Sequence, residues 1–132
     1  MSLNSYFWSD LNTQDFAGMD KSRAIAVLPL AATEQHGPHL PLSVDTDIVN
    51  AVMAQSMPAL RSQAPGLPVY FLPTQTVGLS PEHAAFPGTL TLKPETLIRL
   101  WTDIAESVKA AGINKLVLFN AHGGHVGAMD VV

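Results

Sequence analysis

Side chains of the kinds that bind divalent metals follow two of the apolar runs in this sequence. Glu34 and His36 come soon after the first run, Asp45 lies further along the same stretch, and His122 follows the last run. Residues two apart in an extended segment point to the same side, so Glu34 and His36 can face one ligand. Carboxylates combined with imidazoles suit zinc, manganese or ferrous iron, and contain too much nitrogen for calcium or magnesium. A metal in such a site lowers the pKa of bound water toward about 7, which favours attack of hydroxide on a polarised carbonyl.

Each of these residues also has a structural interpretation. Glu34 could be a solvated loop carboxylate, and Asp45 or Asp47 could cap a helix, which is the role we favour for Asp47. Lone histidines are more often structural than catalytic. Those in loops or at turns are His39, His83 and His125. The set of four metal-binding types favours a metal site, because ligands in α/β sheets bind at the carboxyl ends of the strands.

The elements that must position these residues follow from the apolar pattern. Short apolar runs predict buried strands at 24–30, 69–72 and 115–119. Apolar residues spaced by three and four predict helices at 47–57, from Pro94 to Gly112, and from 126 to 132. This alternation predicts an α/β fold with a parallel sheet flanked by helices.

Two prolines set limits on these elements. Pro29 lacks an N–H for a sheet ladder, so we expect the first strand to end near it or to lie at an edge. Pro58 is expected to end the first long helix near Met57. The buried stripe predicted for that helix comprises Ile48, Val49, Val52, Met53, Met57 and Leu60. The segment 73–92 is rich in Gly, Pro and Thr and predicts a long ordered loop, a feature that is usually functional.

The composition fits a single domain spanning residues 1–132. Hydrophobic residues make up 47% and charged residues 14%, which permits a core and excludes disorder. A net charge of −4 argues against nucleic-acid binding, and the absence of cysteine excludes a disulfide scaffold and a thiol nucleophile. The apolar runs are too short for a membrane span and no signal peptide is evident, so we expect a cytoplasmic protein without membrane or nucleic-acid partners.

The predicted sheet is small for an open α/β fold. The sequence stops as its last helical pattern begins, and we therefore expect an N-terminal portion of a longer fold. A minimal three-strand domain is the alternative. An incomplete sheet leaves an open edge and apolar surface, which promote association into a homo-oligomer.

Several motifs in this chain resemble the creatininase (creatinine amidohydrolase) family. They are Glu34-Gln-His-Gly-Pro-His-Leu-Pro-Leu42 with Asp45-Thr46, Glu82-His83, Phe86-Pro-Gly-Thr89 and Asn120-Ala-His-Gly-Gly124. The resemblance runs from about Ala24 to Gly124, and its first motif is the most specific. It departs from the pattern at Gly124, where creatininase proper has a Glu, and at His125, where the Gly-Gly branch has an Asn. Many relatives take a further Glu ligand from a later segment that lies beyond this sequence.

The resemblance implies α/β/α layers, a homohexamer and two zinc, manganese or iron ions that serve hydrolysis of a C–N bond. The substrate would be a small cyclic or linear amide, and one branch of the family trims a precursor peptide. By the family pattern the metal ligands are Glu34, His36, Asp45 and His122, with Asp45 bridging the two ions.

A hydrolysis scheme follows from this ligand set. Hydroxide held between the two metals would attack the amide carbon, and His83 or His125 would protonate the leaving nitrogen. Glu82, Gly123 and Gly124 are expected at the substrate, where the glycines let the backbone pass close to a ligand. Two other functions remain open. The turn after the last strand could cradle a phosphate in a small-molecule-binding module, or the chain could be an inactive structural fragment.

Overall fold

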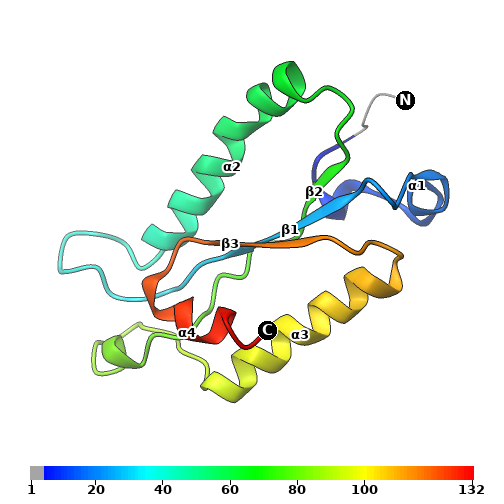
Figure 1. Ribbon diagram of the computed structural model, residues 1–132. Helices are drawn as coiled ribbons and strands as arrows, with labels where there is room; N and C mark the ends of the chain where they lie inside the picture. Colours follow the sequence, from blue (N-terminus) through cyan, green and yellow to red (C-terminus); the bar gives the residue numbers. More distant parts are fainter. Residues whose placement is uncertain (1–4) are drawn as a thin grey trace.

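Three parallel strands form the centre of the computed structural model, which describes residues 5–132 (Figure 1). Strand β1 (Ile25–Leu30) lies between β2 (Val69–Phe71) and β3 (Leu116–Asn120), giving the order β2-β1-β3. Parallel neighbours place the carboxyl ends of all three strands at one edge of the sheet. The predicted α/β class is confirmed, and the predicted strands differ from the observed ones by one residue at one end or, for β3, at both ends.

Helices cover both faces of this sheet (Figure 1). They are α1 (Thr13–Gly18), α2 (Val44–Gln63), α3 (Pro94–Ala110) and α4 (Val126–Met129), with short 3-10 turns η1 (Trp8–Asp10), η2 (Pro81–His83) and η3 (Gly123–His125). Helix α2 lies on one side of the sheet, and α3 with α4 lies on the other. The side chains of β1 alternate accordingly, because successive residues of a strand face opposite sides. Val27 packs with Met53 and Met57 of α2, whereas Leu28 packs with Leu97 and Trp101 of α3.

The first strand ends one residue after Pro29, as expected, and it lies at the centre of the sheet and not at an edge. The neighbours of this proline, Leu28 and Leu30, are fully buried and pair with β3. The nitrogen of Pro29 faces the β2 side, where the ladder has already ended at the pair Val27–Phe71. No ladder hydrogen bond is therefore lost at this position.

Helix α2 is longer than expected at both ends. It begins at Val44, so Asp47 lies in its first turn, accepts a hydrogen bond from the Ser43 hydroxyl at 2.7 Å, and is not the N-cap. It also continues through Pro58, which is exposed, so water can reach the carbonyl that the proline leaves without a partner. The expected stripe is narrower than the sequence suggested: Ile48 and Val52 are about half exposed.

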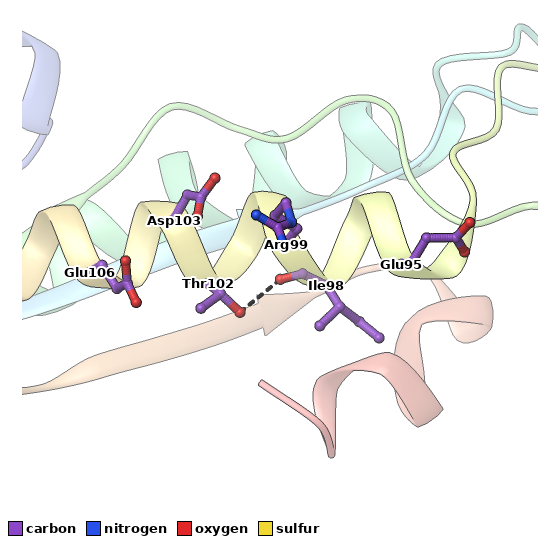
Figure 2. Close-up of a pocket in the computed structure, with 6 residues that line it drawn as sticks. All are labelled: Glu95, Ile98, Arg99, Thr102, Asp103 and Glu106. Carbon is purple, nitrogen blue, oxygen red and sulfur yellow. Dashed lines mark hydrogen bonds between the residues drawn. The ribbon is translucent and has the colours of Figure 1, made fainter.

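The segment 73–92 is ordered as predicted. Its only helical piece among residues 5–132 is η2, and isolated bridges tie it to the rest of the chain, including one between Leu30 and Gln75 and one between Thr33 and Leu90. Helix α3 then begins at Pro94, as predicted, and Gly112 follows its end with a φ of +90°. A shallow hollow of about 580 Å³ lies along α3 (Figure 2). Its lining residues are Glu95, Ile98, Arg99, Thr102, Asp103 and Glu106.

Helix α1 was not predicted, although its start signal is present in the sequence. The Asn12 side chain accepts hydrogen bonds from the backbone of Gln14 and Asp15, and the Asp15 side chain accepts one from the backbone of Asn12. This reciprocal pair is a capping box. Within residues 5–132, no helix has both the length and the apolar character that crossing a bilayer requires.

Candidate metal centre

The four residues expected to bind a metal come from three elements that meet at the carboxyl edge of the sheet. Glu34 and His36 lie in the segment after β1, Asp45 lies in the first turn of α2, and His122 follows β3. The backbone N–H of Glu34 donates to the carbonyl of Leu42 at 3.1 Å, which folds this segment back toward the start of α2. The free N–H groups at the start of α2 favour a carboxylate there, which suits Asp45.

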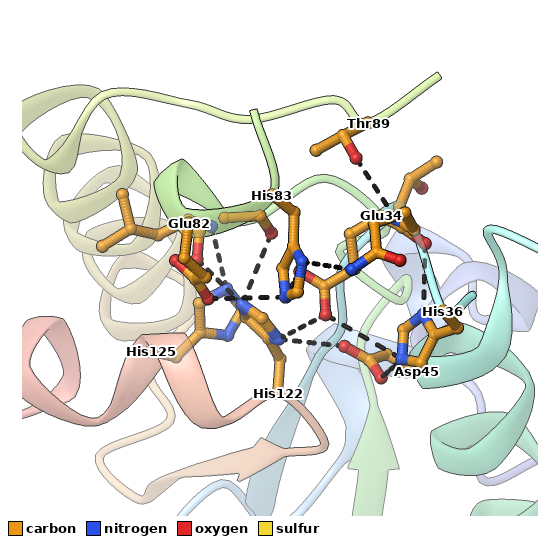
Figure 3. Close-up of polar contacts among 12 residues, drawn as sticks. Glu34, His36, Asp45, Glu82, His83, Thr89, His122 and His125 are labelled. Atoms are coloured by element: carbon orange, nitrogen blue, oxygen red, sulfur yellow. Dashed lines mark hydrogen bonds and ion pairs between the residues drawn. The ribbon is translucent and has the colours of Figure 1, made fainter. Parts of the chain in front are cut away.

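The structure brings the side chains of these four residues together (Figure 3). Nδ1 of His122 lies 3.2 Å from Oε1 of Glu34 and 3.0 Å from Oδ2 of Asp45. Nε2 of His36 lies 3.2 Å from Oδ1 of Asp45 and 3.9 Å from Oε1 of Glu34. Two carboxylates and two imidazoles therefore face one another across a space of a few ångströms.

The hydrogen bonds on the far sides of both imidazoles fix their tautomers. Nε2 of His122 lies 2.8 Å from the carbonyl of Leu79, so this nitrogen carries the proton and donates it. Nδ1 of His36 donates in the same way to the carbonyl of Glu34 at 3.1 Å. The nitrogens that face the carboxylates therefore present lone pairs, which is how second-shell hydrogen bonds orient histidine ligands around a metal.

In this arrangement the lone pairs of the two imidazole nitrogens face the carboxylate oxygens of Glu34 and Asp45. Neither side supplies a hydrogen for a hydrogen bond. The contact between His122 and Asp45 would be a hydrogen bond only if the imidazole carried a second proton. Oε2 of Glu34 and Oδ2 of Asp45 are buried without a hydrogen-bond partner. Burial and the nearby Glu34 carboxylate raise the pKa of Asp45. Within residues 5–132 no lysine or arginine forms an ion pair with these carboxylates, so a divalent cation is the partner that the donor set fits.

The turn η2 brings Glu82 and His83 to the same cluster from the opposite side. Nε2 of His83 lies 3.8 Å from Oε2 of Glu34 and 3.8 Å from Oε1 of Glu82. The amide nitrogen of Gln35 donates to Nδ1 of His83 at 2.7 Å, and the amide oxygen of Gln35 accepts from the backbone of Gly37. Because Gln35 is oriented in this way, Nε2 of His83 carries the proton and points at the carboxylates. Sequence reasoning missed Gln35, because nothing in its local pattern marks the distant contact with η2.

His125 lies behind His122, on the core side of the centre. It is 1% exposed, its Nε2 accepts from the backbone N–H of Leu79 at 3.2 Å, and its Nδ1 donates to the Asn120 side chain at 2.9 Å. Burial, with a smaller contribution from His122, lowers the pKa of His125 to about 4. The backbone of Leu79 thus donates its N–H to His125 and accepts from His122 at its carbonyl, and these two hydrogen bonds fix the position of His122.

The two glycines after His122 have different surroundings. A Cβ at Gly123 would meet nothing, and this glycine is exposed. A Cβ at Gly124 would lie 2.5 Å from the carbonyl of Leu79 and 2.6 Å from Nε2 of His122. The turn can therefore pass this close to the loop only with glycine at position 124. Among the histidines that the sequence analysis considered structural, His39 differs from the buried His125 because it is exposed.

Comparisons with known proteins agree on one family. The family model described as creatinine amidohydrolase matches residues 9–132. The chain belongs to the creatininase family. It is 43% identical over 78% of its length to a mycofactocin precursor peptide peptidase of Mycobacterium tuberculosis (strain CDC 1551 / Oshkosh), covering 42% of that protein. It is 33% identical over 89% of its length to a creatinine amidohydrolase of Pseudomonas putida, covering 45% of that protein.

The solved structures give the same result for the fold. A mutant creatininase of Zn–Zn type superposes with a TM-score of 0.79 at 26% identity, over 98% of this chain and 51% of that one. This creatininase-family chain thus spans about half the length of the relatives it matches. None of the residues that line the hollow on α3 belongs to the cluster in Figure 3, so the cluster is the candidate site of this family member.

Proposed function

We propose that this chain carries the metal-binding part of a hydrolase that cleaves the C–N bond of an amide or peptide. The observation that supports this most directly is the convergence of His36 and His122 on the buried carboxylates of Glu34 and Asp45. The relatives described as a precursor peptide peptidase and a creatinine amidohydrolase are named for reactions of this class. Whether the substrate is a small amide or a peptide is the point on which these relatives differ.

In this proposal Glu34, His36, Asp45 and His122 hold two divalent ions of zinc, manganese or iron. One relative is described as a Zn–Zn type creatininase and another as a manganese creatininase. Such ions, when bound, acidify water and polarise a carbonyl, which is the chemistry that amide hydrolysis needs. Among the metals, the pairing of imidazole with carboxylate favours these three over calcium and magnesium.

Protonation of the leaving nitrogen is assigned to His83. An amide anion is a very poor leaving group, so a positioned acid must supply a proton. His83 is partly exposed and its Nε2–H faces the carboxylate cluster, held there by Gln35. His125 is the other candidate from the sequence, but both of its ring nitrogens are already hydrogen bonded in the interior. We therefore favour His83 as the acid and regard His125 as a positioning residue.

The substrate would enter from the side on which η2 and η3 lie. Glu82 and Gly123 are exposed there, and we propose that they lie against the bound substrate together with the backbone of Gly124. The alternative of a phosphate-binding module is disfavoured, because the cluster presents carboxylates to an incoming anion and no lysine or arginine pairs with them within residues 5–132.

We further propose a cytoplasmic, homo-oligomeric protein, with a hexamer as the family pattern implies. Strand β3 forms an edge of the three-stranded sheet, and Val117 on it is about half exposed. Ile48 and Val52 add exposed apolar area on α2. An unpaired edge and exposed aliphatic side chains of this kind favour association with further protein.

The test compares two aspartates of the same helix turn. Asp45→Asn removes a carboxylate of the cluster, whereas Asp47→Asn, the matched control, removes an exposed one that contacts Ser43. We expect Asp47→Asn to keep the metal content of the parent protein and Asp45→Asn to lose at least about tenfold in metal affinity. Elemental analysis measures the metal, and hydrolysis of amide and peptide substrates with and without EDTA measures its role. Full activity after complete metal removal would refute the proposal.

A further inference from the structure

Phe86 is an aromatic side chain that the fold leaves on the surface beside the metal centre. It is 50% exposed, and within residues 5–132 it packs against neither of the two apolar clusters that join the sheet to its helices. Its ring lies next to that of His83, with the ring centroids 6.5 Å apart, which is within the range at which aromatic rings interact. An exposed apolar surface therefore borders the residue that we assign as the acid.

The backbone holds Phe86 in place through a tight turn. The N–H of Phe86 donates to the carbonyl of His83 at 3.0 Å, and the carbonyl of Phe86 accepts from the N–H of Thr89 at 3.3 Å. Pro87 and Gly88 lie between Phe86 and Thr89, and Gly88 has a φ of +96°. Proline followed by glycine with a positive φ is the pattern of a type II turn, in which Phe86 is the first residue.

Two contacts anchor this turn to the segment that follows β1. The hydroxyl oxygen of Thr89 accepts a hydrogen bond from the backbone N–H of Gln35 at 3.2 Å. A Cβ at Gly88 would lie 2.8 Å from Cδ1 of Leu42, so the turn rests directly on that side chain. The ring of Phe86 is thus presented to solvent on a fixed backbone, which lowers the entropy cost of binding a ligand against it.

The position of His83 indicates which part of a substrate would meet this ring. In the proposed function, His83 protonates the leaving nitrogen of the amide. The side chain of the residue that supplies this nitrogen begins on the carbon bonded to it, so that side chain passes close to His83. Phe86, as the aromatic neighbour of His83, is placed to meet it.

We propose that Phe86 contacts an apolar side chain on the residue that supplies the leaving nitrogen, and so favours substrates that carry one. The inference rests on the proposed function and narrows its substrate class to peptides of this kind. Burial of an apolar side chain against an aromatic ring is favourable because both surfaces leave water.

The experiment compares two peptides of identical composition, N-acetylglycyl-phenylalaninamide and N-acetylphenylalanyl-glycinamide. Only the first places an aromatic side chain on the leaving side of its central peptide bond. Hydrolysis of this bond is measured with the Mn²⁺-loaded parent protein, Phe86→Ala, Phe86→Leu and the matched control Phe7→Ala. Phe7 is another exposed phenylalanine with a tilted aromatic neighbour, and it lies before α1. Calorimetry with the metal-free proteins compares binding of the first peptide without turnover.

We expect the parent protein to hydrolyse the first peptide with a kcat/KM at least about tenfold higher than the second. In Phe86→Ala this ratio should fall close to one and the first peptide should bind more weakly, whereas Phe86→Leu should keep part of the preference. Phe7→Ala should keep the preference and the affinity of the parent. Elemental analysis and circular dichroism confirm that each variant binds metal and is folded.

The other outcomes separate this inference from the proposed function. An equal preference in the parent and Phe86→Ala, or no preference in the parent, would overturn the role of Phe86 and leave the proposed function intact. Loss of hydrolysis of both peptides by folded, metal-loaded Phe86→Ala would overturn it too, because Phe86 would then act on His83 and not on the substrate. A lower mass of Phe86→Ala in light scattering, with an unchanged preference, would assign the ring to a contact between copies. Absence of metal-dependent hydrolysis of any amide by the parent would overturn the proposed function together with the inference.

Discussion

Acid should destabilise this protein through one buried histidine, His125. This side chain is 1% exposed, accepts from the backbone of Leu79 and donates to Asn120, so its neutral form fits the interior and its cation does not. The pKa of His125 is lowered from 6.5 to about 4 in the folded protein. The unfolded chain therefore takes up a proton at a pH where the folded protein still excludes it.

The sign and size of the effect follow from this difference. Above about pH 6.5 His125 is neutral in both states, and its contribution to stability does not change with pH. As the pH falls below this value, protonation stabilises the unfolded chain, and the loss amounts to about 2 kcal/mol at pH 5 and about 3 kcal/mol below pH 4. Asp45 acts in the opposite sense, because a raised carboxyl pKa lets the folded state gain a proton first as the pH falls.

A variant isolates the histidine contribution from that of Asp45. His125→Asn can still donate to Asn120 but leaves the Leu79 N–H without its acceptor, which costs about 1–3 kcal/mol near neutral pH. We expect the stability gap between the parent and His125→Asn to narrow by about 2 kcal/mol from pH 7.5 to pH 5. His39→Asn, at an exposed position, is the matched control and should show no such change.

The assay is urea unfolding in EDTA, so that metal binding does not contribute. Tryptophan fluorescence reports it directly, because the Trp101 ring packs edge-on against His125 with centroids 5.0 Å apart. Parallel pH dependences for the parent and His125→Asn would refute the view that His125 stays neutral in the fold.

Two further predictions concern packing and association. Gly78→Ala would place a Cβ in collision with Nε2 of His125 and 2.8 Å from the carbonyl of Ala31. We therefore expect the free energy of unfolding, measured by thermal unfolding, to fall by about 1–3 kcal/mol. An unchanged melting temperature would contradict this prediction and mean that the loop relaxes freely at this position. Val117→Lys should reduce self-association seen by light scattering, because it charges the exposed residue of an edge strand; an unaltered mass would exclude this edge from the interface.

The elements and the convergence of the cluster were readable from sequence for one physical reason. In a parallel sheet every strand delivers its following residue to the same edge, so apolar runs alone place Glu34 and His122 near one another. The same rule explains why Asp45 arrives there, because α2 starts where the chain returns from that edge.

A local rule for proline can be applied correctly only with the surroundings of the residue. The first strand ends just after Pro29, as predicted, and Pro29 is tolerated in this central strand because its nitrogen faces the place where the β2 ladder has already ended. Pro58 is tolerated in α2 because it lies on the exposed side. The roles of Gln35 and Leu79 depend on how the segment 73–92 folds over the site, and contacts between residues this far apart in sequence leave no periodic signal.

The segment 73–92 divides the centre into a fixed side and an adjustable side. On the fixed side the backbone of Leu79 is held by His125 at its N–H and by His122 at its carbonyl, so the ring of His122 is already oriented before any ligand binds. Just beyond it, η2 carries Glu82 on an exposed turn. Such a division suits the metal hydrolase proposed above, because the ligands that hold the cation must be rigid while the side that meets substrate must exchange partners. Substitutions at Leu79 contacts should therefore alter metal affinity, whereas changes at Glu82, which we propose lies against the substrate, should alter substrate binding and leave the position of His122 unchanged.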